Sequence, residues 1–447
     1  MTALADPPTA LSRRWSALDT AAGGLALDLG LYAAATAFAA ITAATSTLPP
    51  HRAWGAVATI GYALAALAAT TQLLARRRDP GTTLARLPAR WAITALTWAT
   101  TALLPVVTQS VERAAGRTDR AQEEVIVVEH AGTRLAEHGT PYLGPDAIAA
   151  LPPGEQLLGY TPYQPGMALF GLPRAAVDAW WTDSRVWFAV VTALTLVALV
   201  ATLRAHGGPA APRRDAAVLR AVQAATVLPV CALTLATGGD DLPVLALCLL
   251  ALALAATGRP GRAGLAVGVA GALKLLAWPV AVVLICWAAT RRAAPRTALG
   301  ALGLPVLALL PVLLVDRDAL VENVLRFPLG HGLVTSPAQS PFPGHLIAET
   351  LPAGRAVAAA LLVAAGLAIA ARLLRRPPRT AAATALICGY GLLAAILLMP
   401  STRFGYLLYP AALLVLAPAL ALTRPGDPAA FPATAPREGA RRRTPEE

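Results

Sequence analysis

The sequence predicts an all-α, polytopic integral membrane protein. Hydrophobic residues make up 56% of the 447 positions, and only 14% of the residues are charged. The mean hydropathy is +0.58. A bilayer core is crossed by about 20 consecutive apolar residues, and such runs recur along the whole chain. The arginines lie in short polar stretches at the edges of these runs, which is the pattern of cytoplasmic loops.

The net charge of +12 does not indicate nucleic-acid binding. Almost all of its arginines lie in short polar loops, and no basic stretch alternates with aromatic residues as a base-stacking surface requires. The four cysteines lie in apolar segments without short paired spacing, which argues against a disulfide framework or a zinc site. We expect neither a metal ion nor another cofactor.

We predict 11 or 12 membrane segments in one domain over residues 22–422. A cytoplasmic N-terminus of residues 1–21 precedes this domain, and a disordered cytoplasmic tail of residues 423–447 follows it. The candidate spans are residues 22–46, 53–75, 88–109, 185–204, 216–236, 241–257, 263–290, 296–315, 353–373, 380–399 and 403–422. With the N-terminus inside the cell, the charge rule places two long loops outside, residues 110–183 and residues 316–352.

Residues 263–290 determine the topology of the second half of the chain. A single crossing would place the arginines from Arg291 to Arg379 outside, against the charge rule, whereas a hairpin returns them to the cytoplasm. Each arm of about 13 residues would be roughly 20 Å long, too short for a core of about 30 Å. We therefore predict a re-entrant or thin hairpin, broken near Trp278-Pro279, with Lys274 near its apex.

Lys274 is the only lysine in the chain. A charge at mid-membrane depth costs roughly 2.5–3.5 kcal/mol on insertion scales, so the default expectation is a functional site with a partner. In the second outer loop, His331 and His345 are candidate hydrogen-bond donors to the phosphate of a ligand, although a lone loop histidine is more often solvated. Arg403, at the outer mouth of the last segment, either extends to lipid headgroups or holds a lipid phosphate.

The first outer loop contains a predicted amphipathic helix at the membrane interface, residues 121–138. A carboxylate at its start is placed for general-base work. Glu123 and Glu124 point about 100° apart on a helix, so one of them faces a cavity more easily, and we favour Glu124. The alternative is that both only stabilise the helix N-terminus through its dipole.

For the remaining polar residues the sequence predicts a position but no chemical role. The helix leaves Glu129 on its polar side, and Asp240 and Asp241 are predicted to form an exposed turn. Asp28 is expected to be structural. The stiff segments GTPYL and YTPYQPG carry Tyr142, Tyr160 and Tyr163, which are predicted to form an aromatic wall.

Three stretches resemble the membrane-embedded GT-C glycosyltransferases. Among these enzymes, the stretches are most similar to the actinobacterial polyprenol-phosphate-mannose-dependent α-mannosyltransferases. They are the acidic helix running into GTPYL and YTPYQPG, then TGGDD with the following GRPGRAG and ALKLLAWP, and finally STRFGYLLYP. The resemblance covers residues 120–410. It implies an inverting enzyme without a nucleotide sugar, whose catalytic carboxylate lies in the first outer loop. Where the family has an aspartate, this chain has Glu124, with Asp119 as the alternative.

These observations together predict a sugar transferase of the outer membrane face. The resemblance implies a polyprenyl-phosphate donor carrying mannose and a lipid or glycan acceptor of the cell envelope. Lys274 and Arg403 are then expected to neutralise the departing phosphate, and membrane lipids surround the protein. Two other classes remain open: a transporter or flippase of lipid-linked glycans, and a non-catalytic membrane scaffold. The large outer loop and the lack of a defensible internal repeat favour the enzyme.

Overall fold

The long apolar runs of the sequence are helices in the computed structural model, which describes residues 19–205 and 210–423. Within these residues the only β-type pairing is one isolated bridge between Gln339 and Thr402. The predicted all-α class is therefore confirmed. The predicted tail lies outside the described residues apart from Thr423, and so does most of the N-terminal segment.

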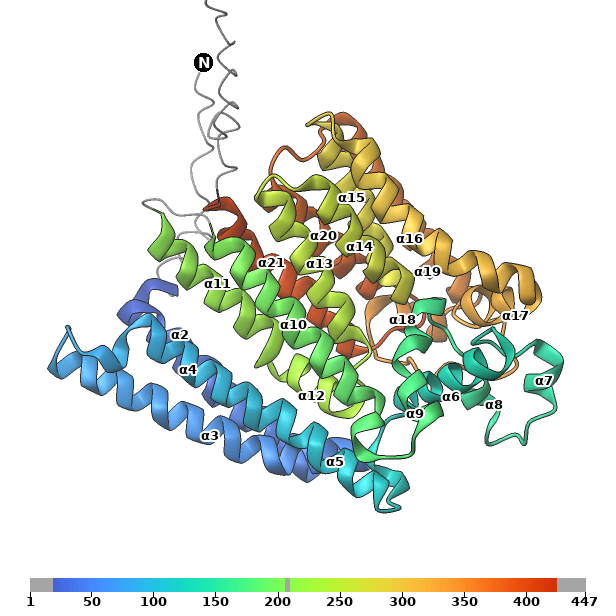
Figure 1. Ribbon diagram of the computed structural model, residues 1–447, viewed down its shortest axis with the longest axis horizontal. Helices are drawn as coiled ribbons and strands as arrows, with labels where there is room; N and C mark the ends of the chain where they lie inside the picture. Colours follow the sequence, from blue (N-terminus) through green and yellow to red (C-terminus); the bar gives the residue numbers. More distant parts are fainter. Residues whose placement is uncertain (1–18, 206–209, 424–447) are drawn as a thin grey trace, which may run out of the picture.

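The N-terminal helices form a layer along one side of the molecule (Figure 1). The layer contains η1 (Ala21–Gly24), α2 (Leu25–Thr45), α3 (Pro49–Arg78), η2 (Thr83–Ala85), α4 (Leu87–Trp98), η3 (Ala99–Leu103), α5 (Leu104–Ala114) and η4 (Thr118–Arg120). Prolines stand in the first turns of α3 and α4, where no backbone N–H is needed. Pro105 of α5 instead lies inside the continuous helix Leu87–Ala114, directly after the π-helical turn η3. Three arginines end α3, where they complement the helix dipole.

The central bundle is built around α13, in which nearly every side chain is buried. Its helices are α10 (Ser184–Arg204), α11 (Ala211–Thr226), α12 (Pro229–Thr237), α13 (Asp241–Ala256), α14 (Pro260–Leu273), η7 (Leu275–Ala277), α15 (Trp278–Ala289), α16 (Ala294–Val315), α20 (Ala381–Leu398), η9 (Phe404–Leu407) and α21 (Leu408–Ala421). A helix that is apolar all round belongs inside a large bundle.

The structure confirms a polytopic protein, but fewer of its described helices have the length of a full span than the 11 or 12 segments predicted. Among the described residues, eight helices are long and apolar enough to cross a membrane, or nine if α11 and α12, bent by 44°, count as one span. The helices α13, α14 and α15 have only 16, 14 and 12 residues. At 1.5 Å per residue the longest of them covers about 24 Å, less than the roughly 30 Å of a bilayer core.

The helices α14 and α16 run parallel in close contact. A Cβ atom added to Gly264 would lie 2.2 Å from the Thr297 carbonyl oxygen, and one added to Gly268 would lie 2.0 Å from that of Gly300. Because α16 begins beside the start of α14, the intervening α15 runs in the opposite direction. The chain turns at Lys274, which has extended backbone angles, and the Trp278 indole donates to the Gly271 carbonyl at 3.1 Å.

Two segments between the long helices pack together at one end of the bundle (Figure 1). The first contains α6 (Glu123–His138), α7 (Pro145–Ala149), α8 (Gln156–Gly159), η5 (Pro165–Phe170), α9 (Leu172–Ala176) and η6 (Trp180–Thr182). The second contains α17 (Arg317–Val321), η8 (Glu322–Arg326) and α18 (Pro343–Thr350), and leads into α19 (Gly354–Arg375). Stacked rings of Tyr160 and Phe327, 4.1 Å apart, join the two segments.

The helix α6 is more deeply packed than the sequence predicts. Its Gly132 meets the backbone of Gly171 so closely that an added Cβ atom would lie 2.2 Å from the Gly171 carbonyl carbon. Glu129, predicted to lie on the polar side, is only 5% exposed. That prediction is wrong because Glu129 faces Arg113 of α5, a partner that the helical pattern of α6 alone does not reveal.

Candidate functional site

The first turn of α6 rests on the turn between α12 and α13. The Gln122 backbone N–H donates to the Thr237 carbonyl at 3.0 Å, and the Thr237 hydroxyl donates to the Gln122 side-chain oxygen at 2.8 Å. Gly238 follows, and a Cβ atom there would lie 3.9 Å from Glu124 Oε2. The next residue, Gly239, has a φ of +91°, a conformation that favours glycine. These contacts bring the Glu124 carboxylate against the TGGDD motif.

Glu124 forms an ion pair with Arg403, which lies just before η9. The Glu124 side chain is 14% exposed and the Arg403 side chain 31%. A second contact fixes the backbone on which Arg403 stands. The Ser340 N–H donates to the Thr402 carbonyl at 2.9 Å, and the Phe404 N–H donates to the Ser340 hydroxyl at 2.9 Å. Three segments far apart in the sequence therefore position this pair.

Lys274 lies between two carboxylates. Its ammonium nitrogen is 2.7 Å from Asp240 Oδ2 and 2.6 Å from Asp241 Oδ1. The Tyr409 hydroxyl donates to Asp241 Oδ1 at 2.7 Å, and Lys274 also faces the Tyr163 and Tyr406 rings, with 5.2 and 5.5 Å to their centroids. Buried charges are tolerated when they are paired and hydrogen-bonded in this way.

The predicted exposed turn at Asp240 and Asp241 is therefore wrong, since both side chains are buried. The sequence did offer a signal, because a lone lysine at membrane depth needs an acidic partner. Tyr163 belongs to the same cluster, and burial together with the neighbouring carboxylates raises the pKa of its hydroxyl. Two further residues near this site were not predicted: Gln122, and His51 at the start of α3, whose electrostatic environment includes Gln122 and Arg403.

The other candidate carboxylates lie away from this cluster. Glu123 is exposed. Asp119 is on the surface, where hydrogen bonds from Arg117 lower the pKa of its carboxyl group. Arg120 also contacts Asp119, at 2.8 Å. Of the two adjacent acids, Glu124 is the one that faces a cation, and its catalytic role stays a prediction.

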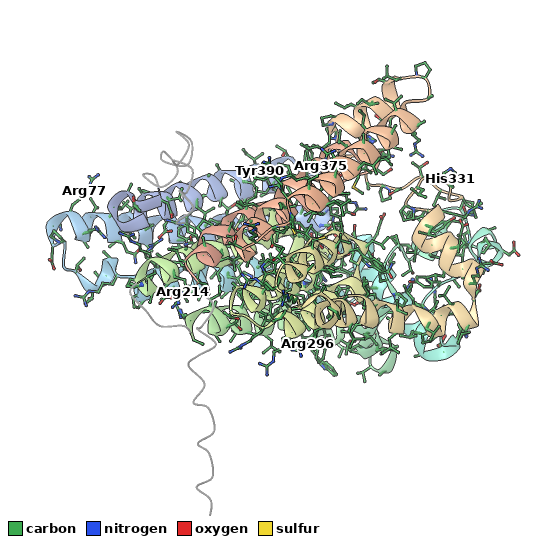
Figure 2. The ribbon with its side chains drawn as sticks, turned by 90° about the horizontal axis from the view of Figure 1, so that it is seen from above. Arg77, Arg214, Arg296, His331, Arg375 and Tyr390 are labelled. Atoms are coloured by element: carbon green, nitrogen blue, oxygen red, sulfur yellow. The ribbon has the colours of Figure 1, made fainter. Side chains whose placement is uncertain are left out.

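The two candidate histidines occupy different surroundings. His331 is exposed at the end of the molecule opposite Arg77 (Figure 2). His345 is buried, with Nδ1 3.0 Å from the Pro400 carbonyl oxygen and Nε2 3.2 Å from Glu349 Oε1. It lines a hollow of about 60 Å³ beside Ser401. His345 is thus held next to the segment that carries Arg403, and His331 is not.

The three predicted wall tyrosines separate into two groups. Tyr142 donates to the Tyr163 carbonyl at 2.7 Å, which ties it to the Lys274 cluster. Tyr160 instead joins the two long loops: its hydroxyl is 3.0 Å from Glu322 Oε1 and accepts from the Leu333 N–H at 2.8 Å. Asn323 strengthens this junction by accepting from the Thr161 N–H at 2.7 Å.

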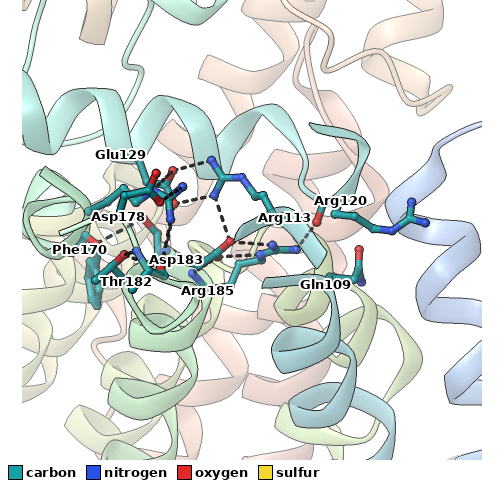
Figure 3. Close-up of polar contacts among 12 residues, drawn as sticks. Gln109, Arg113, Arg120, Glu129, Phe170, Asp178, Thr182, Asp183 and Arg185 are labelled. Atoms are coloured by element: carbon teal, nitrogen blue, oxygen red, sulfur yellow. Dashed lines mark hydrogen bonds and ion pairs between the residues drawn. The ribbon is translucent and has the colours of Figure 1, made fainter. Parts of the chain in front are cut away.

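A second charged network fixes α6 to the bundle (Figure 3). Arg113 of α5 makes two hydrogen bonds to Glu129, at 2.7 and 2.6 Å, and one to Asp183 at 3.0 Å. Asp183 also accepts from Arg185 at 2.9 and 2.8 Å. Burial opposes ionisation of Asp183, but Arg185 and Arg113 overcome it and lower its pKa to about 2. This network orients the helix that carries Glu124.

A third network ties α2, α4 and α11 together. Asp28 is 2.6 Å from Arg90 Nε and also pairs with Arg220, which reaches Asp19 at 2.7 Å. Gln223 completes it with a hydrogen bond to Asp28 at 3.0 Å. The structural role expected for Asp28 agrees with these contacts. Among the described residues no group of three or more His, Cys, Asp or Glu is arranged to hold a metal ion.

The model of Glycosyltransferase family 87 matches residues 160–400, more than half of the chain. The match includes Asp240, Asp241, Lys274 and His345, whereas Arg403 lies shortly after its end and Glu124 lies well before its start. No curated protein and no solved structure matches the chain significantly.

Proposed function

Because the chain belongs to glycosyltransferase family 87, we propose that it moves mannose from a polyprenyl-phosphate donor to a lipid or glycan acceptor of the cell envelope. The transfer inverts the anomeric centre and takes place at the outer membrane face. The donor and sugar follow from the resemblance of the motifs to polyprenol-phosphate-mannose-dependent enzymes. Family membership favours transfer over the alternative of a transporter or flippase.

The observation that carries the proposal is the meeting of Glu124, Arg403 and the Lys274 cluster at one end of the bundle. The contacts of Gln122 and Gly238 hold Glu124 against the TGGDD turn, and the pairing of Ser340 with Thr402 holds Arg403 there. A carboxylate base and a phosphate-binding cation within reach of each other are what a phosphate-leaving sugar transfer requires.

The proposed reaction proceeds in one displacement. Glu124 accepts the proton of an acceptor hydroxyl, and the acceptor oxygen attacks the anomeric carbon of the donor sugar. The bond between that carbon and the phosphate oxygen breaks, and its electron pair leaves with the polyprenyl phosphate. Arg403 stabilises the negative charge on the departing phosphate. Lys274 was predicted to share this task, and His345 is close enough to the Arg403 segment to assist.

The outer location follows from the distribution of arginines. The arginine-rich ends of several helices gather away from Glu124: Arg90 and Arg220 contact the start of α2, and Arg291 donates to the Arg379 carbonyl at 3.2 Å. Arginine-rich loops face the cytoplasm in most membrane proteins. On this rule both chain ends are cytoplasmic and the Glu124 site opens to the outer leaflet.

The proposal is tested by measuring sugar transfer in proteoliposomes that carry the protein. The proteoliposomes are supplied with labelled polyprenyl-phosphate mannose and candidate acceptors. We expect Glu124→Gln to lower the transfer rate about 10²- to 10⁴-fold, the usual contribution of a general base. Glu124→Asp should keep part of the activity because it retains the carboxylate. Glu137→Gln, on an exposed acid of the same helix, is the matched control. Unchanged transfer in Glu124→Gln removes Glu124 from the role, and label crossing the bilayer without product favours the flippase.

A further inference from the structure

The charges of the candidate site do not favour a phosphate in the described conformation. Three carboxylates, those of Glu124, Asp240 and Asp241, face two cations, Lys274 and Arg403. The cluster therefore carries a net negative charge, and a phosphate group adds another. Like charges at a few ångströms repel strongly at low dielectric. A change of partner by one cation would relieve this repulsion and let a phosphate bind.

Lys274 is poorly placed to make that change. Its side chain is 9% exposed, and it has two carboxylate contacts within 2.7 Å and two aromatic rings around it. Moving it would leave two buried carboxylates without a counter-ion, which is strongly unfavourable. Lys274 therefore keeps Asp240 and Asp241 in place.

Arg403 is better placed than Lys274 to change its partner. Its side chain is 31% exposed and, among the described residues, pairs with a single carboxylate, that of Glu124. Its backbone is fixed on both sides by the hydrogen bonds of Thr402 and Phe404 to Ser340. A change of partner therefore needs only rotation of the arginine side chain. The planar guanidinium, with five donors, also suits a phosphate group well.

We propose that Arg403 is exchanged between two anions: Glu124 in the free protein and the phosphate of a polyprenyl-phosphate ligand in the complex. This inference rests on the proposed function and assigns Arg403 as the phosphate-binding residue. Its consequence is an order of events. Binding of the phosphate removes the cation that holds the Glu124 carboxylate in an ion pair, so this carboxylate is free to accept a proton only when the donor is present. The donor then binds before the acceptor is deprotonated.

Equilibrium binding of labelled polyprenyl phosphate to the purified full-length protein tests the exchange. Glu124→Gln removes the competing anion, so we expect binding roughly 3- to 30-fold tighter than in the wild type, since the pair lies between fully exposed and fully buried. Arg403→Gln should bind several-fold more weakly. In the double variant Glu124→Gln, Arg403→Gln, the gain should disappear, because Glu124 acts on binding only through Arg403. Glu137→Gln should bind as the wild type does.

Two results overturn the exchange: binding to Glu124→Gln that is equal to or weaker than wild type, or a gain that persists without Arg403. Glu124→Ala removes the same carboxylate and serves if the glutamine variant does not elute as a monodisperse protein. The same variant tests the proposed function by a separate measurement, that of sugar transfer. Tighter binding with undiminished sugar transfer in Glu124→Gln supports the exchange and rejects the base, whereas lost transfer with unchanged binding does the reverse.

Discussion

At the scale of single residues, Lys274 and its two carboxylates form the most buried charged group of the candidate site. Each contact is within 2.7 Å, and the Tyr409 hydroxyl satisfies Asp241 further. Breaking a buried ion pair by removing one partner is costly because the other charge is left uncompensated. Lys274 is held where the short helices α14 and α15 meet, so its charge fixes the hairpin apex to the start of α13.

We expect Lys274→Met to lower the free energy of unfolding by about 3–5 kcal/mol, because it leaves two buried carboxylates unpaired. The triple variant Lys274→Met, Asp240→Asn, Asp241→Asn removes all three charges and should recover part of that loss. Thermal unfolding of the purified proteins in one detergent, followed by circular dichroism, compares them. A single variant as stable as the wild type would show that the lysine charge does not stabilise the fold.

At the scale of helices, the contact between α14 and α16 depends on glycine. The Gly268 position lets the two backbones approach so closely that any side chain would collide with the Gly300 carbonyl. Small residues at such positions are the usual means of close helix packing in membranes. The contact fixes the direction of α16, whose start follows Arg291 at the end of the bundle where Arg379 lies.

Gly268→Ala should destabilise the protein by about 1–3 kcal/mol, the usual loss on overpacking. Gly366→Ala in α19 is the matched control, because no atom lies within 4 Å of its added Cβ. In a helix, alanine is up to about 1 kcal/mol more favourable than glycine, so this variant should be as stable as the wild type or slightly more so. Equal losses in the two variants would argue against close packing at Gly268. The fraction of folded protein after heating measures both.

The sequence predicted many of these elements but not how they meet. Helix ends follow from local signals, as with the prolines that begin α3 and the arginines that end it. The number of long helices is lower than the predicted number of segments because α13, α14 and α15 are apolar yet short. For residues 263–290, which hold most of α14 and all of α15, the sequence already predicted a hairpin with arms too short to cross. The partners of Lys274 and Glu129 were missed for another reason. Asp240 and Arg113 approach them only after distant segments pack, and the pattern along one helix carries no such information.

At the scale of the whole molecule, the charged groups divide between two ends. One end has the Asp28 network and the arginine-rich helix ends, and the other has Glu124, Arg403 and the two long loops. Arg77 and His331 lie at opposite ends of the chain's structure (Figure 2). Eight long helices and a bent pair run between these ends, and the shorter α13 leads from Asp241, beside Lys274, back toward the start of α14 at the arginine end. Such a division is expected if the bilayer lies across the bundle with the arginine end in the cytoplasm.

Labelling of single cysteines in intact cells with a membrane-impermeant maleimide tests this orientation. The native cysteines Cys231, Cys248 and Cys388 are buried, and Cys286→Ser removes the partly exposed one. In that background, Glu137→Cys and His331→Cys should react from outside. Arg77→Cys and Arg375→Cys should react only after the membrane is opened, because they belong to the arginine end. Labelling of Arg375→Cys in intact cells would place α19 in the opposite direction and move the Glu124 site to the cytoplasmic face. A polyprenyl-phosphate donor in the outer leaflet could then not reach Arg403, so this result would reject the proposed side of the reaction.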